Sequence, residues 1–157
     1  MKDNPARIRY AGDDLFVATT GSGHAQVLDT NGGRSSAASP LELLLVALGG
    51  CTAVDVVSIL NKSRAQITGY DIEVSGRRRD EHPRSFEQIE VHHILRGRGI
   101  TERAVERAIK LSEEKYCSVA ATLRPAAAII SRYTILPDSE SGVANQDAVV
   151  EEEAPAV

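Results

Sequence analysis

The stretch Ser39-Pro-Leu-Glu-Leu-Leu-Leu-Val-Ala-Leu-Gly-Gly-Cys51 predicts the central element of this 157-residue chain. Its serine, followed three residues later by Glu42, forms a capping-box pattern, and proline occupies the first helical position, so a helix begins here. The helix is expected to reach about Arg64 and is apolar on nearly every side over residues 43–60. Such a helix is expected to be buried on several sides.

The helix carries Gly49 and Gly50 immediately before Cys51, and each glycine weakens a helix by about 1 kcal/mol relative to alanine. A cost of this kind needs a packing reason, and we expect another backbone to approach closely here. A single sheet can cover only one side of so apolar a helix. The other side is left to a second helix or to a second copy of the chain.

Alternating apolar and polar runs on both sides of the helix predict strands separated by turns. A long hairpin around His82-Pro83, with one face in water, follows the helix. A second helix capped by Thr101 and reaching Tyr116 leads to a short helical stretch that Pro125 ends. The predicted fold class is α+β, with antiparallel sheets packed on a buried central helix. The expected strands cover residues 7–10, 15–20, 24–28, 70–74, 86–95 and 128–135.

Length and charge indicate one domain over residues 1–137, followed by an acidic disordered tail over residues 138–157. The 18 basic and 22 acidic side chains give a net charge of −4, and six of the acids lie in the tail without a base. The nearly neutral body argues against nucleic acid or an acidic membrane as a partner. The N-terminus lacks the apolar segment of a signal sequence, and Asp55 interrupts the longest apolar run, so we expect a soluble cytoplasmic protein.

The two cysteines lie in unlike settings, Cys51 within the apolar helix and Cys117 after a polar helix. Two cysteines are too few for a secreted disulfide scaffold, and a reducing compartment keeps them as thiols. A thiol in an apolar wall is normally inert, whereas one near a helix N-terminus or a cation ionises readily. The pair can therefore divide the steps of a redox cycle, and two buried structural cysteines are the alternative.

The capped helix ending in Cys51, together with the distant segment Tyr116-Cys-Ser-Val-Ala-Ala-Thr-Leu123, resembles the OsmC/Ohr family of osmotically inducible and organic hydroperoxide resistance proteins. The similarity extends from the N-terminal strands to the last strand near Ile135, and it is greater to the OsmC-like branch. It implies an OsmC-like two-layer fold, an intertwined homodimer with active sites at its interface, and thiol-dependent peroxidase activity.

In the scheme that this resemblance implies, Cys51 is the peroxidatic thiol, which becomes a sulfenic acid, and Cys117 resolves it as a disulfide. An external dithiol reductant, such as a dihydrolipoyl group, then reduces that bond. The scheme requires no cofactor and no metal. Apolar neighbours of the first thiol on its helix favour organic hydroperoxides over hydrogen peroxide; these are Leu44, Ala47, Leu48 and Val54.

The resemblance also implies roles for Glu42 and for an arginine. In the family, a glutamate at this position orients the arginine that polarises the peroxide and stabilises the thiolate. Helix geometry puts Glu42 on the face opposite Cys51 and roughly 13 Å along the axis, so it can serve only the thiol of another chain. It is otherwise simply part of the capping box. A cation is needed at the thiol, and Arg34 is the candidate, unless it is merely solvated, with Arg7 and Arg9 as alternatives.

Other polar residues receive structural interpretations. Asp55, one turn after Cys51, is expected to mark where the helix meets solvent or to pair with a base. A direct catalytic role is not expected, because a nearby carboxylate raises the pKa of a thiol. His92 and His93 point to opposite faces of their strand and cannot share one metal. Two alternative functions are a non-catalytic dimeric small-molecule-binding or redox-sensing protein, and a purely structural stress-related dimer with inert thiols.

Overall fold

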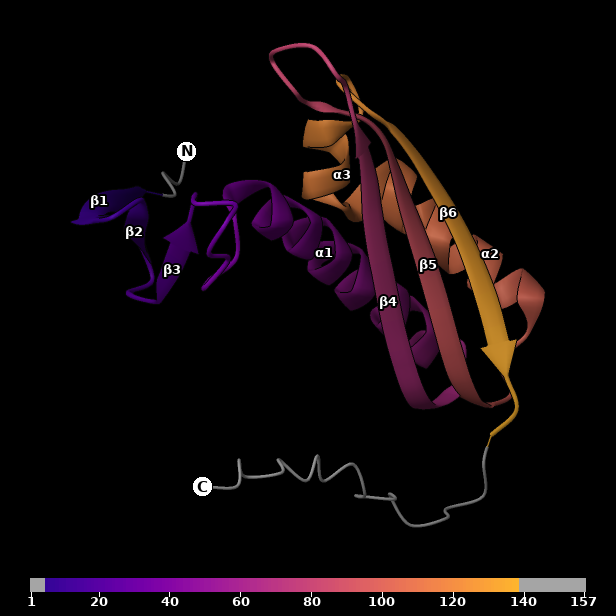
Figure 1. Ribbon diagram of the computed structural model, residues 1–157. Helices are drawn as coiled ribbons and strands as arrows, with labels where there is room; N and C mark the ends of the chain where they lie inside the picture. Colours follow the sequence, from indigo (N-terminus) through magenta and orange to yellow (C-terminus); the bar gives the residue numbers. More distant parts are fainter. Residues whose placement is uncertain (1–4, 139–157) are drawn as a thin grey trace, which may run out of the picture.

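The computed structural model describes residues 5–138 of the chain. The fold has two three-stranded sheets and a long central helix: one sheet lies beyond the N-terminal end of that helix, and the other packs along it (Figure 1). The elements are β1 (Ala6–Gly12), β2 (Leu15–Thr20), β3 (Ala25–Asp29), α1 (Pro40–Lys62), β4 (Gln66–Arg78), β5 (Phe86–Arg98), α2 (Glu102–Leu111), the π-helix η1 (Ser112–Tyr116), α3 (Ser118–Leu123) and β6 (Ala128–Leu136).

The start of α1 is the one that the sequence predicts. The Glu42 N–H donates to the Ser39 hydroxyl at 3.3 Å, and the Ser39 N–H donates to the Glu42 carboxylate at 2.7 Å. These two reciprocal bonds satisfy backbone donors that have no partner inside the helix. The capping box is therefore confirmed, and the helix ends at Lys62, close to the expected Arg64.

The larger sheet has the order β4-β5-β6. Strands β4 and β5 form the predicted antiparallel hairpin, but β6 pairs with β5 in parallel, so the expectation of purely antiparallel sheets is wrong for this strand. The physical reason is the connection. Parallel neighbours need a crossover long enough to return the chain to the same end of the sheet, and α2, η1 and α3 supply it between Arg98 and Ala128.

Helices cover one face of the larger sheet (Figure 1), and mostly alternate residues of β5 are buried, so this face builds the core. Towards one end, Leu48 of α1 packs with Ile89 and Val91. Towards the other end, side chains of α1 and α2 enclose Leu95. The other face is polar, as expected for this hairpin: His92 bonds to Thr134 at 2.8 Å and to Glu73 at 3.3 Å.

Only one stripe of α1 is buried within the protomer, although the sequence predicts burial on several sides. The buried residues recur mostly every fourth position, whereas Val46 is 66% and Val54 71% exposed. Although Asp55 interrupts its apolar run, the helix is as long and as apolar as a membrane-spanning segment, with a mean hydropathy of 2.3. Its buried stripe lies against the larger sheet and α2, so within this protomer it acts as a core helix that keeps a second apolar face uncovered.

The two glycines of α1 have different surroundings. A Cβ on Gly49 would lie 3.0 Å from a methyl carbon of Val74 and 3.6 Å from one of Ile72, so β4 approaches the helix there. The close approach that the sequence predicts is thus made by side chains of β4 rather than by another backbone. A Cβ on Gly50 would have no neighbour within 4 Å. Packing within the protomer therefore does not explain why a glycine stands at this position.

The smaller sheet is the predicted antiparallel meander β1-β2-β3. It lies beyond the N-terminal end of α1, apart from the larger sheet (Figure 1). Asp29 is the one buried residue among its three strands, and Ile8 and Tyr10 are 56% and 62% exposed. This sheet therefore contributes almost no apolar core to its own protomer.

The predicted tail begins with a residue that has specific contacts. The Asp138 carboxylate accepts hydrogen bonds from the Thr68 hydroxyl at 2.7 Å and from the Arg98 guanidinium at 2.8 Å. The rest of the predicted acidic tail, residues 139–157, lies outside the described residues.

Candidate active site

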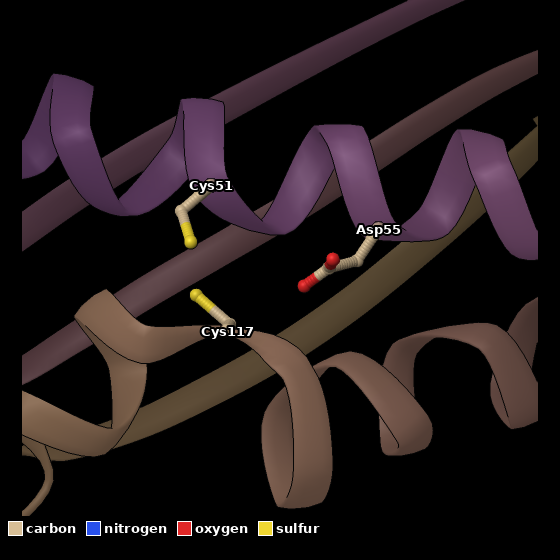
Figure 2. Close-up of side chains that lie close together, drawn as sticks. All are labelled: Cys51, Asp55 and Cys117. Carbon is tan, nitrogen blue, oxygen red and sulfur yellow. The ribbon is translucent and has the colours of Figure 1, made fainter.

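The central helix and the start of α3 bring the two cysteines together. Their sulfur atoms point toward one another across the gap between α1 and the α2–α3 segment (Figure 2), within 4.8 Å. Both residues belong to the same apolar cluster as Leu48. Cys51 is half-buried, whereas Cys117 is only 2% exposed, so one thiol can meet an incoming molecule and the other lies behind it.

A change in helix type positions Cys117. The sequence predicts one regular helix as far as Tyr116, but α2 ends at Leu111 and is continued by one wide π-helical turn. The Cys117 N–H donates to the Ser112 carbonyl at 2.8 Å, five residues back. Cys117 is also the N-cap of α3, and its sulfur accepts a hydrogen bond from the Ala120 N–H at 3.3 Å. Such π-turns frequently occur at functional sites, and this one directs the thiol toward α1.

Asp55 lies beside the two thiols and forms with them a cluster of three polar side chains. Its carboxylate lies one turn beyond Cys51 and points into the same space (Figure 2), and one ligand atom from each of the three residues lies within 4.8 Å of the others. The Ser112 hydroxyl donates to Oδ2 of this carboxylate at 2.9 Å. The partly exposed Asp55 borders a surface hollow, as expected for a residue where the helix meets solvent. Its described hydrogen-bond partner is the Ser112 hydroxyl rather than a base.

The surroundings oppose ionisation of Cys51. Burial raises the pKa of this thiol above its ordinary value, and the neighbouring Cys117 and Asp55 raise it further. The Val119 N–H, at the start of α3, acts in the opposite direction by donating to the sulfur. Among the described residues of the protomer, the charged group that acts on this thiol is the Asp55 carboxylate, and no cation offsets its effect.

Arg34 is held against the smaller sheet by residues of the β1–β2 turn and the end of β3. Its guanidinium bonds to the carboxylate of Asp29 at 3.0 Å and pairs with Asp13. The guanidinium holds the pKa of the Asp29 carboxyl well below its usual range. The two alternatives, Arg7 and Arg9, line a hollow on the smaller sheet and form no ion pair with a described residue.

Glu42 lies away from the thiols of its own protomer, as helix geometry predicts. Together with Gly50 it borders an apolar groove of about 460 Å³ along the uncovered face of α1, whose remaining lining residues are Leu45, Val46, Gly49, Ile72 and Val74. The hydrogen bond from the Ser39 N–H lowers the pKa of Glu42, so this carboxylate is anionic at neutral pH.

The fold and the paired thiols define a class of protein, and comparison with known sequences agrees with it. The sequence model of the family described as "OsmC-like protein" matches residues 32–131, so the chain belongs to the OsmC-like family. Protein YhfA of Escherichia coli K12 is 42% identical over 131 residues, which are 83% of this chain and 97% of YhfA. The resemblance that the sequence suggests is confirmed at the level of the family.

Solved structures give the same fold. A hypothetical protein from Aquifex aeolicus VF5 superposes with a TM-score of 0.79 at 32% identity, over 88% of this chain and 100% of the other. The organic hydroperoxide resistance protein OhrB of Bacillus subtilis superposes with a TM-score of 0.60 over 85% of this chain and 98% of the other. At 12% identity, OhrB is similar in fold alone.

The sequence did not lead us to predict that two residues, Asp55 and Ser112, lie beside the thiols. Asp55 stands four positions after Cys51, a spacing that places both side chains on one helical face, so the signal was present. Ser112 gave no comparable signal, because its contact with Asp55 depends on how α2 crosses α1 and on the π-turn that follows.

Proposed function

We propose that the protein is a thiol-dependent peroxidase that reduces organic hydroperoxides and, more slowly, hydrogen peroxide. The observation that carries the proposal is the meeting of two thiols from distant segments, with their sulfurs facing each other within 4.8 Å. Their unequal exposure supports different roles for the two thiols. The half-buried Cys51 attacks the peroxide, and the enclosed Cys117 acts second.

The reaction proceeds in three balanced steps. The Cys51 thiolate attacks one peroxide oxygen, the O–O bond breaks, and the alkoxide leaves with a proton as an alcohol, so that sulfur becomes a sulfenic acid. The Cys117 thiol then attacks that sulfur, forming a disulfide and releasing water. An external dithiol reduces the disulfide through a mixed disulfide and is itself oxidised. A reducing cytoplasm, where we place the enzyme, supplies dithiols of this kind.

A second copy of the chain supplies what the protomer lacks. The uncovered face of α1 is apolar around the groove, and Glu42 lies on it. In an intertwined homodimer, this face packs against the partner and delivers the Glu42 carboxylate toward the other Cys51, while an arginine comes from β1 or from the loop before α1. Arg34 is the original candidate for that arginine, but its two aspartate partners leave it less free than Arg7 or Arg9.

Turnover of an alkyl hydroperoxide with a dithiol reductant tests the proposal. We expect Cys51→Ser to abolish turnover and Cys117→Ser to leave at most a single, unresolved oxidation of the protein. Ser118→Ala, an exposed neighbour of the second thiol, is the matched control and should leave turnover unchanged. Full turnover by Cys51→Ser would refute the proposal. Oxidation to one disulfide per chain without turnover would favour the redox-sensing alternative instead.

Arginine variants identify the cation. If Arg7 or Arg9 acts on the partner's thiol, its replacement by glutamine lowers the rate of Cys51 oxidation by roughly 100-fold, since removal of one stabilising donor commonly costs that much. Arg34→Gln then lowers the rate much less. The reverse order would assign the role to Arg34.

Sedimentation tests the dimer. Val46→Asp introduces a charge on the uncovered face of α1 and is expected to shift the protein to a monomer. Ile130→Asp places the same charge on a similarly accessible position, 49% exposed, of the larger sheet and serves as the control. A dimer that tolerates Val46→Asp would show that the interface lies elsewhere.

A further inference from the structure

The cluster of Cys51, Asp55 and Cys117 has the composition of a metal site as well as that of a redox pair. It offers two sulfur ligands and one carboxylate oxygen, all within 4.8 Å of one another. Around a tetrahedral zinc ion, ligand atoms at about 2.0–2.3 Å from the metal lie roughly 3.5–3.8 Å from each other. The limit of 4.8 Å exceeds that separation by only about 1 Å, a difference that side-chain rotation can reduce.

The three ligands are also supported from outside. The Ser112 hydroxyl donates to Oδ2 of the Asp55 carboxylate at 2.9 Å, which restrains the orientation of that carboxylate. The Ala120 N–H donates a hydrogen bond to the sulfur of Cys117 at 3.3 Å. Hydrogen bonds of this kind orient ligands and raise affinity in known metal centres.

The charge balance favours a cation at this point. The groups that act on the Cys51 thiol are a second thiol and a carboxylate, so full ionisation of the cluster would place three negative charges together. A divalent ion neutralises most of that charge. Soft thiolates select zinc-like ions, whereas calcium and magnesium prefer sites made of oxygen alone.

We propose that Cys51, Asp55 and Cys117 of the reduced protein bind one thiophilic divalent cation of the zinc class, with water in the fourth position. Binding forms two metal–sulfur bonds and one metal–oxygen bond, and it releases the protons that the two thiols carried. The inference is independent of the peroxide chemistry, since it needs only the reduced thiols. Because both sulfurs would be occupied, the bound ion would also protect the pair from oxidation.

Cobalt(II) titration of the reduced, chelator-treated full chain, under anaerobic conditions and without peroxide, tests the site. We expect a saturating absorbance change at one ion per chain, with a sulfur-to-cobalt charge-transfer band in the near ultraviolet and visible bands typical of tetrahedral cobalt. Added zinc should abolish these bands by displacement. Proton release measured during the same titration gives a second readout.

Variants assign the ligands. Cys51→Ser and Cys117→Ser should each weaken the charge-transfer band and the affinity strongly. Asp55→Asn keeps the shape of the side chain and should weaken cobalt binding by at least about tenfold, and Ser112→Ala by roughly tenfold. Asp71→Asn, an exposed acid on β4, is the matched control and should bind as the parent does. Circular dichroism verifies that each variant is folded.

Two results would overturn the site. One is the lack of a saturable charge-transfer band in the folded, reduced parent protein. The other is a band that Asp55→Asn leaves unchanged, which would show that the carboxylate is not a ligand. Neither result bears on peroxidase turnover, because the titration contains no peroxide, and loss of turnover would leave the binding result standing.

Discussion

The two sheets of this molecule differ in what covers them. The larger sheet has a layer of three helices on one face, and its residues His93 and Leu95 are completely buried. The smaller sheet has no such layer in its own protomer, and Ile8 and Tyr10 are more than half exposed. The larger sheet therefore has a hydrophobic core within its own protomer. The smaller sheet leaves its apolar side chains exposed, and the proposed dimer would bury them.

Truncation of one apolar residue in each sheet gives the largest expected contrast. Leu95→Ala removes a completely buried side chain and should lower the free energy of unfolding by about 2–5 kcal/mol. Ile8→Ala should change it by less than about 0.5 kcal/mol in dilute, monomeric protein. Denaturant unfolding measures both values. A similar loss in the two variants would break the comparison, because it would mean that the smaller sheet has a core of its own.

Acid should destabilise the larger sheet through His93. This ring is buried beside Tyr70, whose hydroxyl lies 2.6 Å from Nδ1, and its Nε2 has no described partner. Burial, with a smaller contribution from His92, lowers the pKa of His93 from 6.5 to about 4. The unfolded chain therefore takes up a proton near pH 6.5 that the folded chain resists until about pH 4, so this contribution to stability is complete above pH 6.5 and is lost as the pH falls.

The expected loss from His93 is about 1.4 kcal/mol per pH unit between pH 6.5 and 4, or about 3 kcal/mol in all. Unfolding measured at several pH values checks it, with His93→Gln as the comparison. The variant should show a shallower dependence on pH in this window. An identical slope in both proteins would mean that His93 is protonated in the folded state at the same pH as in the unfolded chain.

In the smaller sheet, a polar clamp takes the place of a core, and its loss should have a local effect. Asp29 accepts hydrogen bonds from the Arg34 guanidinium and from the amides of Asn31 and Ser36. Arg34→Gln should speed hydrogen exchange of these two amides roughly tenfold while global unfolding stays nearly unchanged. Because the folded pKa of Asp29 is lowered from 3.8, the clamp should persist at pH 4 and open only at lower pH. A large global loss would show that the clamp supports the whole domain.

An ion pair on the larger sheet should matter least. Arg96 and Asp71 lie 2.9 Å apart across β4 and β5, but both side chains are substantially exposed. Pairs of this kind contribute about 0–1 kcal/mol, and salt screens them. Asp71→Asn should therefore lower the free energy of unfolding by no more than about 0.5 kcal/mol at physiological salt. A loss above 1 kcal/mol would show that this sheet, too, depends on its surface charges.

Local signals explain why much of the fold could be predicted. The capping box fixed the start of α1, alternation located the hairpin, and Thr101 marked the start of α2, where its hydroxyl accepts from the Ala104 N–H. The direction of β6 could not be predicted in the same way. A strand carries the same alternating pattern whether its neighbour is parallel or antiparallel, and the path of the crossover decides between them.

The sequence by itself determined the central helix, the strand-forming segments, the family resemblance and the two residues most capable of redox chemistry, because each depends on spacing within a short stretch of chain. Tertiary structure decided the rest. It placed Asp55 and Ser112 beside the thiols, engaged Arg34 with two aspartates, and left one face of α1 uncovered. These arrangements depend on how distant elements pack and on a single π-turn, and neither feature leaves a periodic signal in the sequence.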